Sequence, residues 1–280
     1  MHETTLTTAD AQHLHLRVWM PIAAPHAVLL IVHGLGEHAG RYPHVVETFL
    51  TAGYAIYGHD HRGFGRSSGK RGDYDHFDQI LADLDQVVEL ARSQHPGLPL
   101  CLYAHSLGGL IATHYLARHE TKIAAAVISA PGYGAGPDLN AAKIQLAKIM
   151  ARILPGFSMN TGGSKDFRLS HDAEVQRAYE SDTLRHDIVT MRFVHMTLQK
   201  AEEGKAVLAT LRLPILVMLG EEDTSINRQA VHDAVAQAGP TVTFRRYPGG
   251  YHEVHNEIAA IRQPALAGVL AWMEAQLHGD

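Results

Sequence analysis

Short apolar runs alternate with longer segments of helical periodicity along most of the chain. Continuous apolar runs, such as residues 27–32, predict strands that are covered on both faces of a sheet. Apolar residues spaced three and four apart, as over residues 77–91, predict amphipathic helices. The pattern predicts strands over residues 14–20, 27–32, 54–57, 100–103, 124–129, 213–219 and 241–247, and helices over residues 42–52, 77–91, 107–117, 228–238 and 264–277. This alternation is typical of an α/β fold with a mostly parallel, doubly wound sheet.

The alternation stops after Pro131. No strand is predicted between residues 132 and 209, where the periodicity favours helices over residues 140–154, 173–181 and 188–205. We therefore expect a helical insertion over residues 132–209, called the insertion below, in a core made of residues 1–131 and 210–280. Such an insertion would lie as a cap over the carboxyl ends of the strands, where parallel sheets build their sites.

Ser106 lies between a predicted strand and a predicted helix. The residue two before it is Ala104 and the residue two after it is Gly108, and both are small. A strand that turns sharply into a helix needs such neighbours, because backbone segments come into contact there, and the turn pushes the side chain at its apex out of the fold. The hydroxyl would then stand at a helix N-terminus, where N–H groups favour negative charge. The pattern indicates a nucleophile elbow; the alternative is an ordinary serine N-cap.

A serine hydroxyl is a weak nucleophile at neutral pH and needs a general base, which a carboxylate must orient. In doubly wound hydrolases the chain order is serine, acid, histidine. Asp223 and His252 follow Ser106 in this order, and each comes directly after a predicted strand. Because the carboxyl ends of parallel strands share one edge of the sheet, we expect these three residues to form a catalytic triad.

Both partners of the serine have rivals nearby in the chain. Asp223 competes with the two glutamates before it, but its carboxylate is shorter and stiffer and comes after the turn at Gly220. The other interpretation of Asp223 is a helix N-cap. His255 competes with His252; it comes a helical turn later, so we expect it to face solvent or to pack beside the site.

The loop over residues 33–38 follows a predicted buried strand and is rich in glycine. A nucleophilic serine needs two backbone N–H groups aimed at the developing oxyanion. We expect these from Leu107, next to the serine, and from Leu35, where the glycines let the loop approach closely. His33 is expected to be structural and to hydrogen-bond loop backbone. Three polar residues in or near this loop are Glu37, His38 and Arg41. They could either brace the loop or contact a substrate, and the sequence leaves both roles open.

Composition narrows the class of protein. The chain has 280 residues, a net charge of -5 and no basic block, so we expect no nucleic-acid partner. Its N-terminus is polar, its apolar runs are of strand length, and it has one cysteine, Cys101, in a predicted buried strand. We therefore expect a cytoplasmic protein without a signal peptide or a membrane span.

Histidine is unusually frequent, with 21 residues. The order of His252-Glu253-Val254-His255 does not fit a zinc protease motif, and His59-Asp60-His61 lacks the continuation that a metallohydrolase motif requires. We therefore expect neither a metal nor a cofactor. Most of the histidines are scattered along predicted helices and loops and are expected to be solvated, among them His13, His76, His119, His186 and His278.

Five motifs are spread over nearly the whole chain. They are His33-Gly34-Leu35-Gly36-Glu37-His38 with Arg41-Tyr42, Gly58-His59-Asp60-His61-Arg62-Gly63-Phe64-Gly65-Arg66-Ser67, His105-Ser106-Leu107-Gly108-Gly109, Gly220-Glu221-Glu222-Asp223, and His252-Glu253. Together they resemble the monoacylglycerol lipase and lysophospholipase group of α/β-hydrolases. That group usually has glycine where this chain has Ala104. Because alanine is small enough for the turn, we expect the elbow to form with slightly more strain.

The resemblance implies a serine carboxylester hydrolase that cleaves monoacylglycerols or related single-chain lipid esters and needs no cofactor. A broad short-chain esterase or thioesterase of the same fold is the alternative among enzymes. A ligand-binding receptor with a weakened triad is the alternative from a different class.

The predicted helix over residues 140–154 bears on the substrate. Its apolar side includes the candidate substrate-binding residues Leu146, Ile149 and Met150, and its basic residues mostly lie opposite. One interpretation, slightly favoured, is that the apolar side packs onto the core. In the other, it lines an acyl tunnel or makes transient contact with a membrane surface, with the basic residues toward lipid phosphates. A cap helix can do both.

Overall fold

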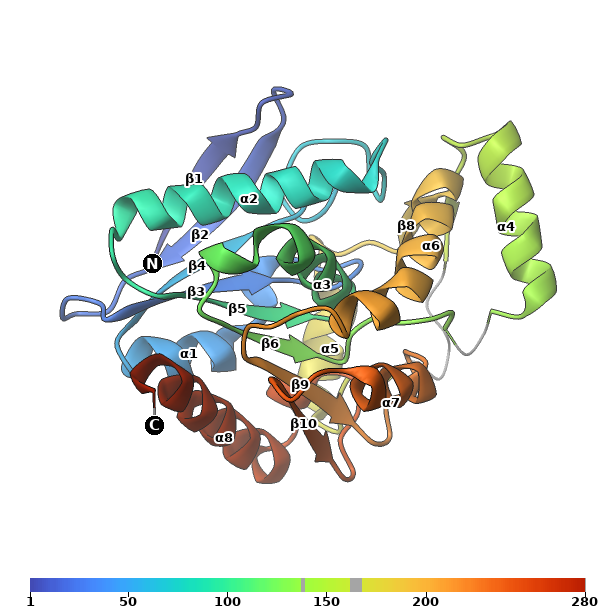
Figure 1. Ribbon diagram of the computed structural model, residues 1–280. Coiled ribbons are helices and arrows are strands. Elements are labelled where there is room, and N and C mark those ends of the chain that lie inside the picture. Colours follow the sequence, from blue (N-terminus) through green and yellow to red (C-terminus); the bar gives the residue numbers. More distant parts are fainter. Residues whose placement is uncertain (137–138, 162–167, 280) are drawn as a thin grey trace.

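The predicted strands form an eight-stranded sheet in the computed structural model, which describes residues 1–136, 139–161 and 168–279 (Figure 1). The two strands at one edge pair antiparallel, β1 with β2 and β2 with β4, and the other neighbours pair parallel. In spatial order the strands are β1 (His2–Thr7), β2 (His13–Trp19), β4 (Tyr54–His59), β3 (Ala27–Val32), β5 (Leu100–His105), β6 (Ala125–Ser129), β9 (Ile215–Gly220) and β10 (Val242–Tyr247). The prediction of a mostly parallel sheet is confirmed.

Helices cover both faces of the sheet, as expected for a doubly wound fold (Figure 1). Every residue of β3 is buried, and successive side chains pack into the hydrophobic layers on opposite faces. Burying one large aliphatic side chain in this way contributes about 1.5–3 kcal/mol. One layer holds α2 (Phe77–Gln94), α3 (Leu107–His119), α6 (Met191–Leu208) and α7 (Arg228–Gln237); the other holds α1 (Pro43–Thr51) and α8 (Ala259–His278). Three short 3-10 turns complete the core: η1 (Ala39–Arg41), η2 (Glu120–Lys122) and η3 (Val254–Asn256).

The insertion lies between β6 and β9. It contains the predicted helices as α4 (Ala141–Ile153), α5 (Ala173–Ser181) and α6, and also a pair of antiparallel strands, β7 (Ser158–Asn160) and β8 (Ile188–Thr190). The prediction that this segment has no strand is therefore wrong, because runs of three residues are too short to show a periodicity. The division of the chain into core and cap stays a prediction.

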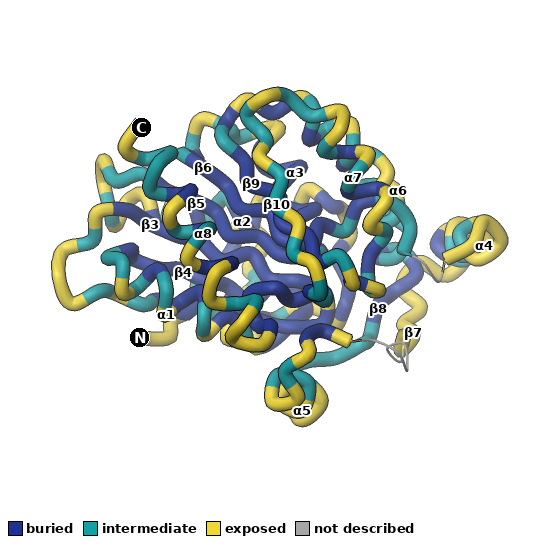
Figure 2. The backbone as a smooth tube through the Cα atoms, turned by 90° about the horizontal axis from the view of Figure 1, so that it is seen from below, coloured by how far each residue is buried: buried dark blue, intermediate teal, exposed yellow. Residues whose placement is uncertain are grey.

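Helix α4 projects from one end of the molecule, and most of its residues are exposed (Figure 2). It packs against α6 through a side on which Ile144 and Ala147 are half-buried and Ala151 is buried. The apolar side that the sequence singled out faces solvent: Leu146 and Ile149 are exposed. The favoured interpretation, in which that side packs onto the core, is therefore wrong.

Strand β1 was not predicted, since it is mostly polar and exposed, lies at the edge of the sheet and pairs with β2 alone. The β1 segment is extended because its backbone N–H and C=O groups pair with those of β2, a tertiary contact that its own residues do not indicate. Within the described residues, no helix combines the length and the apolar character that crossing a bilayer requires.

Candidate active site

Ser106 occupies the turn between β5 and α3, with φ 54° and ψ −116°. A non-glycine residue in such a conformation costs about 1–3 kcal/mol, which the surrounding packing must supply. Gly108 makes the turn feasible, because a Cβ atom there would lie 2.1 Å from the carbonyl oxygen of Val32. The Ser106 side chain makes no capping hydrogen bond to α3. The sharp turn expected of an elbow is present despite Ala104, and Ser106 does not cap α3 through its side chain as an ordinary serine N-cap would. Its role as the nucleophile stays a prediction.

Asp223 and His252 form a buried pair. The Nδ1 atom of His252 lies 2.7 Å from Oδ2 of Asp223, and the other carboxylate oxygen accepts the N–H of Ser225 at 2.7 Å. The ring of His252 lies 4.6 Å from the ring of His105, the residue before Ser106, so both loops reach the same edge of the sheet. The geometry pairs His252 with Asp223 and places the His252 ring beside the residue before Ser106. The triad as a whole stays a prediction.

The rivals of Asp223 point elsewhere. Glu222 is exposed, and Glu221 forms an ion pair with Arg246 at 3.2 Å. The N-cap of α7 is Asn227, whose side chain accepts the N–H of Ala230 at 3.1 Å. Asp223 therefore does not cap that helix.

The charge of Asp223 favours the protonated form of the His252 imidazole. Burial alone lowers the pKa of His252, but the adjacent Asp223 carboxylate outweighs burial, and the pKa of His252 is raised above the ordinary histidine value. Asp223 thus stabilises the imidazolium that forms when His252 takes up a proton.

The loop over residues 33–38 passes directly beside Ser106. A Cβ atom on Gly34 would lie 3.3 Å from Cβ of Ser106, so a larger residue here would press on the nucleophile. The backbone N–H groups of Leu35 and Leu107 donate no hydrogen bond to any residue that the structure describes. The Leu35 side chain is exposed to solvent.

A buried network holds this loop in place. One oxygen of Glu37 accepts the N–H of Gly34 at 2.6 Å and the hydroxyl of Tyr42 at 2.7 Å. The other accepts from Arg41 at 3.0 Å, and Arg41 also makes a bidentate pair with Glu253, at 2.8 and 3.1 Å. In this structure Glu37 and Arg41 brace the loop, which is one of the two roles left open; contact with a substrate stays a prediction.

Glu253 was missed as a site residue, because its partner Arg41 lies 212 positions away and no local pattern links them. One guanidinium serves two buried carboxylates here. Burial raises the pKa of Glu37, whereas for Glu253 the bidentate Arg41 charge outweighs burial and lowers the pKa.

His38 connects the same loop to the insertion. Its Nδ1 accepts the N–H of Gly40 at 3.1 Å, and its Nε2 lies 2.8 Å from a carboxylate oxygen of Asp182. The guanidinium of Arg41 lies over the ring of Tyr179, 4.7 Å from its centroid. The insertion thus contacts the residues that brace the loop.

The structure also tests what was expected of the surroundings of His33, His255 and His186. His33 is structural, as expected: its Nδ1–H donates to the Gly34 carbonyl at 2.7 Å, and its Nε2 accepts the N–H of His61 at 2.8 Å. His255 does not face solvent but is buried and stacks on Tyr42 with ring centroids 4.9 Å apart, and burial lowers its pKa to about 3. It packs beside the site, the other alternative considered.

The expectation that His186 is solvated is also wrong. Its ring is half-buried, stacks on Phe64 with centroids 4.9 Å apart, and donates from Nε2 to the carbonyl of Gly63 at 2.8 Å. This histidine belongs to the contact between the insertion and the core, which the local sequence does not reveal.

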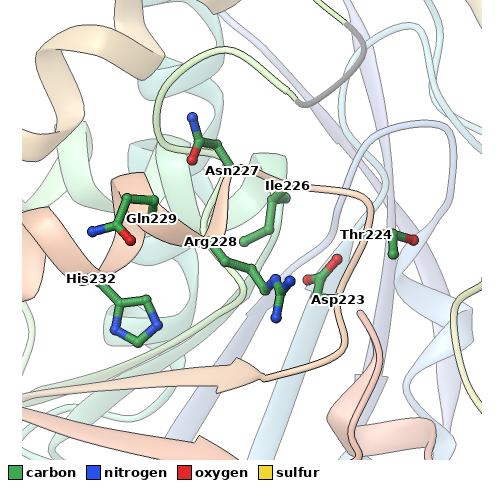
Figure 3. A pocket seen from close by; sticks show the side chains of 7 residues that line it. All are labelled: Asp223, Thr224, Ile226, Asn227, Arg228, Gln229 and His232. Carbon is green, nitrogen blue, oxygen red and sulfur yellow. The ribbon is translucent and has the colours of Figure 1, made fainter.

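The candidate substrate-binding residues of α4 lie at the surface, with Leu146 and Ile149 exposed and Met150 half-buried. A separate pocket of about 570 Å³ lies beside the acid, and Figure 3 shows its side chains on the loop after β9 and on the first turns of α7. Its lining consists of Asp223, Thr224, Ile226, Asn227, Arg228, Gln229 and His232. In the described ranges, no three His, Cys, Asp or Glu side chains are arranged to hold a metal ion.

The chain is similar to known proteins over most of its length. The family described as serine aminopeptidase, S33, matches residues 23–259. A monoacylglycerol lipase of Mycolicibacterium smegmatis is 33% identical over 264 residues, covering 93% of this chain and 92% of that protein. The monoglyceride lipase of Homo sapiens is 28% identical over 271 residues, covering 96% and 89%. The crystal structure of Paleococcus ferrophilus monoacylglycerol lipase matches with a TM-score of 0.84 and 26% identity, covering 94% of this chain and 99% of that one.

Proposed function

Because the chain belongs to the serine aminopeptidase S33 family and has the α/β-hydrolase fold, we propose that it is a serine carboxylester hydrolase acting on monoacylglycerols or related single-chain lipid esters. The observation that carries the proposal is the 2.7 Å contact between His252 and Asp223 at the sheet edge where Ser106 forms an elbow. The family description names a peptidase, but the full-length relatives are named as lipases, which favours ester cleavage.

In the proposed reaction, Oγ of Ser106 attacks the ester carbonyl while His252 takes its proton. His252 then gives the proton to the departing alcohol, which leaves an acyl-enzyme that water hydrolyses by the same steps. Asp223 holds the imidazole through Nδ1, so that Nε2 faces the serine. The N–H groups of Leu35 and Leu107 donate to no acceptor among the residues that the structure describes, which supports their proposed role as the oxyanion hole. One such donor is typically worth about a hundredfold or more in rate.

A chain-length series tests the proposed substrate class. Each methylene that the enzyme buries contributes about 0.8 kcal/mol, so kcat/KM should rise by about tenfold for every two carbons until the acyl site is filled. Monoacylglycerols of increasing acyl length are compared with p-nitrophenyl esters of the same acids. The lipid assignment predicts the highest kcat/KM for long acyl chains.

The same series separates the alternatives. A preference for acetyl and butyryl esters would favour the broad short-chain esterase, and faster turnover of matched thioesters would favour the thioesterase. Saturable binding of lipid esters with no turnover would favour the receptor.

We also propose that the insertion makes transient contact with a membrane surface through α4 and the turn after it. Ile153 is 67% exposed and Phe157 is 54% exposed, next to exposed Leu146 and Ile149. A contiguous exposed apolar surface is typical of a site that contacts a partner or a membrane. The apolar side of the helix is therefore available for the lipid role that the sequence left open.

The double variant Ile153→Glu/Phe157→Glu is expected to lower binding to phosphatidylcholine vesicles by about tenfold or more, because two apolar side chains no longer enter the lipid. Vesicle co-sedimentation measures this loss. The matched control is Met20→Glu/Ile22→Glu, which changes two exposed apolar residues between β2 and β3 and should leave vesicle binding unchanged. Equal losses in the two variants would mean that α4 has no special part in membrane contact.

A further inference from the structure

A fully buried carboxylate, that of Glu257, lies at the meeting point of three chain segments. Its Oε1 accepts the N–H of Tyr251 at 2.8 Å, and its Oε2 accepts the N–H of Ile258 at 3.1 Å. Oε2 also accepts the backbone N–H of His171, in the insertion, at 3.1 Å. Tyr251 is the residue directly before the proposed general base, and Ile258 is the N-cap residue of α8.

The side chain of His171 strengthens the same junction. Its Nδ1 lies 3.1 Å from Oε1 of Glu257, and its ring stacks on Tyr251 with centroids 4.0 Å apart and planes at 13°. Two further bonds run alongside, from the N–H of Glu253 to the carbonyl of Leu169 at 2.8 Å and from the Ser170 hydroxyl to the carbonyl of Asn256 at 2.9 Å. Residues 169–171 and the loop over residues 251–257 therefore form one hydrogen-bonded unit.

Burying an ionised carboxylate is costly unless hydrogen-bond donors replace its water. Here the donors come from backbone N–H groups of separate segments, and only an acceptor with two oxygens holds all of them at once. The arrangement fixes the backbone immediately before His252. A misplacement of about 1 Å in a catalytic group can cost about a hundredfold in rate, so this position matters to the chemistry.

We propose that Glu257 is a positioning residue that couples the insertion, through His171, to the imidazole of His252. The inference rests on the proposed serine hydrolase function. Glu257 acts on the chain that carries the base, through the N–H of Tyr251. A displacement of residues 169–171 is transmitted to the loop of the general base through this carboxylate, beside the two hydrogen bonds and the ring stack described above.

The variant Glu257→Gln tests the proposal. It replaces one carboxylate oxygen with an NH₂ group that opposes the backbone donors. The number of competent sites is titrated with a fluorophosphonate, and kcat and KM are then measured per titrated site on p-nitrophenyl butyrate. We expect kcat per site to fall by about 10- to 100-fold with KM within about twofold, because the imidazole is displaced while the substrate site is intact. If Glu257 were only structural, the titrated fraction would fall and kcat per site would not; that result overturns the proposal.

A second variant tests the coupling without disturbing the buried carboxylate. The His171 side chain is 36% exposed, so His171→Ala should fold, and we expect it to lower kcat per site by about threefold or more. An unchanged kcat per site would overturn the link to the insertion. The control Asp83→Asn alters another fully buried carboxylate, paired with Arg62 at 2.6 Å, and should leave kcat per site unchanged. A loss in this control equal to that of Glu257→Gln would also overturn the proposal. A wild-type protein that neither hydrolyses the ester nor reacts with the probe would refute the proposed function itself.

Discussion

Ser106→Ala is expected to abolish labelling by a fluorophosphonate probe and to lower kcat for ester hydrolysis by about 10⁴- to 10⁶-fold. The backbone at Ser106 adopts a conformation that alanine must also accept, so the fold should be kept while the attacking oxygen is lost. The expected residual rate comes from binding and from the oxyanion hole, neither of which depends on the hydroxyl. Labelling followed by peptide mapping, together with steady-state kinetics, measures both effects.

The control for this variant is Ser225→Ala. The Ser225 hydroxyl is buried near the acid and has no hydrogen-bond partner among the described residues, while its backbone N–H, which contacts Asp223, is retained in alanine. Its labelling and kcat should equal those of the wild type. Persistent labelling of Ser106→Ala would place the nucleophile elsewhere and end the elbow assignment.

Asp223→Asn is expected to lower kcat by about 10⁴-fold and to move the acid limb of the pH–rate profile to lower pH. The loss of kcat follows because the asparagine amide has one accepting oxygen and one donating NH₂ group. If the NH₂ group faces Nδ1, it favours the tautomer with the proton on Nε2, which cannot accept the proton of the serine. The shift of the acid limb follows from charge. The base must be neutral to work, and the Asp223 carboxylate raises the pKa of His252, so the wild type should lose activity as the pH falls through a value above about 6.5. Without the carboxylate, the largest influence that raises the pKa of His252 against burial is lost, so that pKa falls.

A full pH–rate profile of both proteins measures the shift. Glu222→Gln is the matched control, because it removes a neighbouring carboxylate that is exposed. It should change neither kcat nor the acid limb by more than a small amount. An acid limb that stays in place in Asp223→Asn would show that another carboxylate sets the pKa of the base.

The local sequence pattern predicted most strands of the sheet and the three residues of the proposed triad. Strand β3 was placed at its observed limits because both of its faces are buried, so its sequence is continuously apolar. Ser106 was found because a sharp turn requires particular small neighbours, a constraint that acts over a few residues. Strand β1 could not be found in this way, since its order depends on a partner strand rather than on its own residues.

The surroundings of several buried side chains depend on contacts that a local pattern does not display. His255 was expected either to face solvent or to pack beside the site, and η3 directs it inward against Tyr42, which is the second of these. Glu253 and Glu257 were passed over because their partners, Arg41 and His171, come from distant segments. Burial of a charge is decided by such distant partners, and a single sequence does not display them.

The insertion leaves the sheet after β6 and returns at β9, and these two strands are direct neighbours, with Ala126 opposite Ile215. Its length and sequence can therefore diverge by recombination without altering the strand register below it. Under the proposed function, a graft from a relative could change the preferred acyl group while Ser106, Asp223 and His252 are kept in place. A graft must keep residues 169–171, however. Without them the buried Glu257 carboxylate would lose the hydrogen bonds that it accepts from His171.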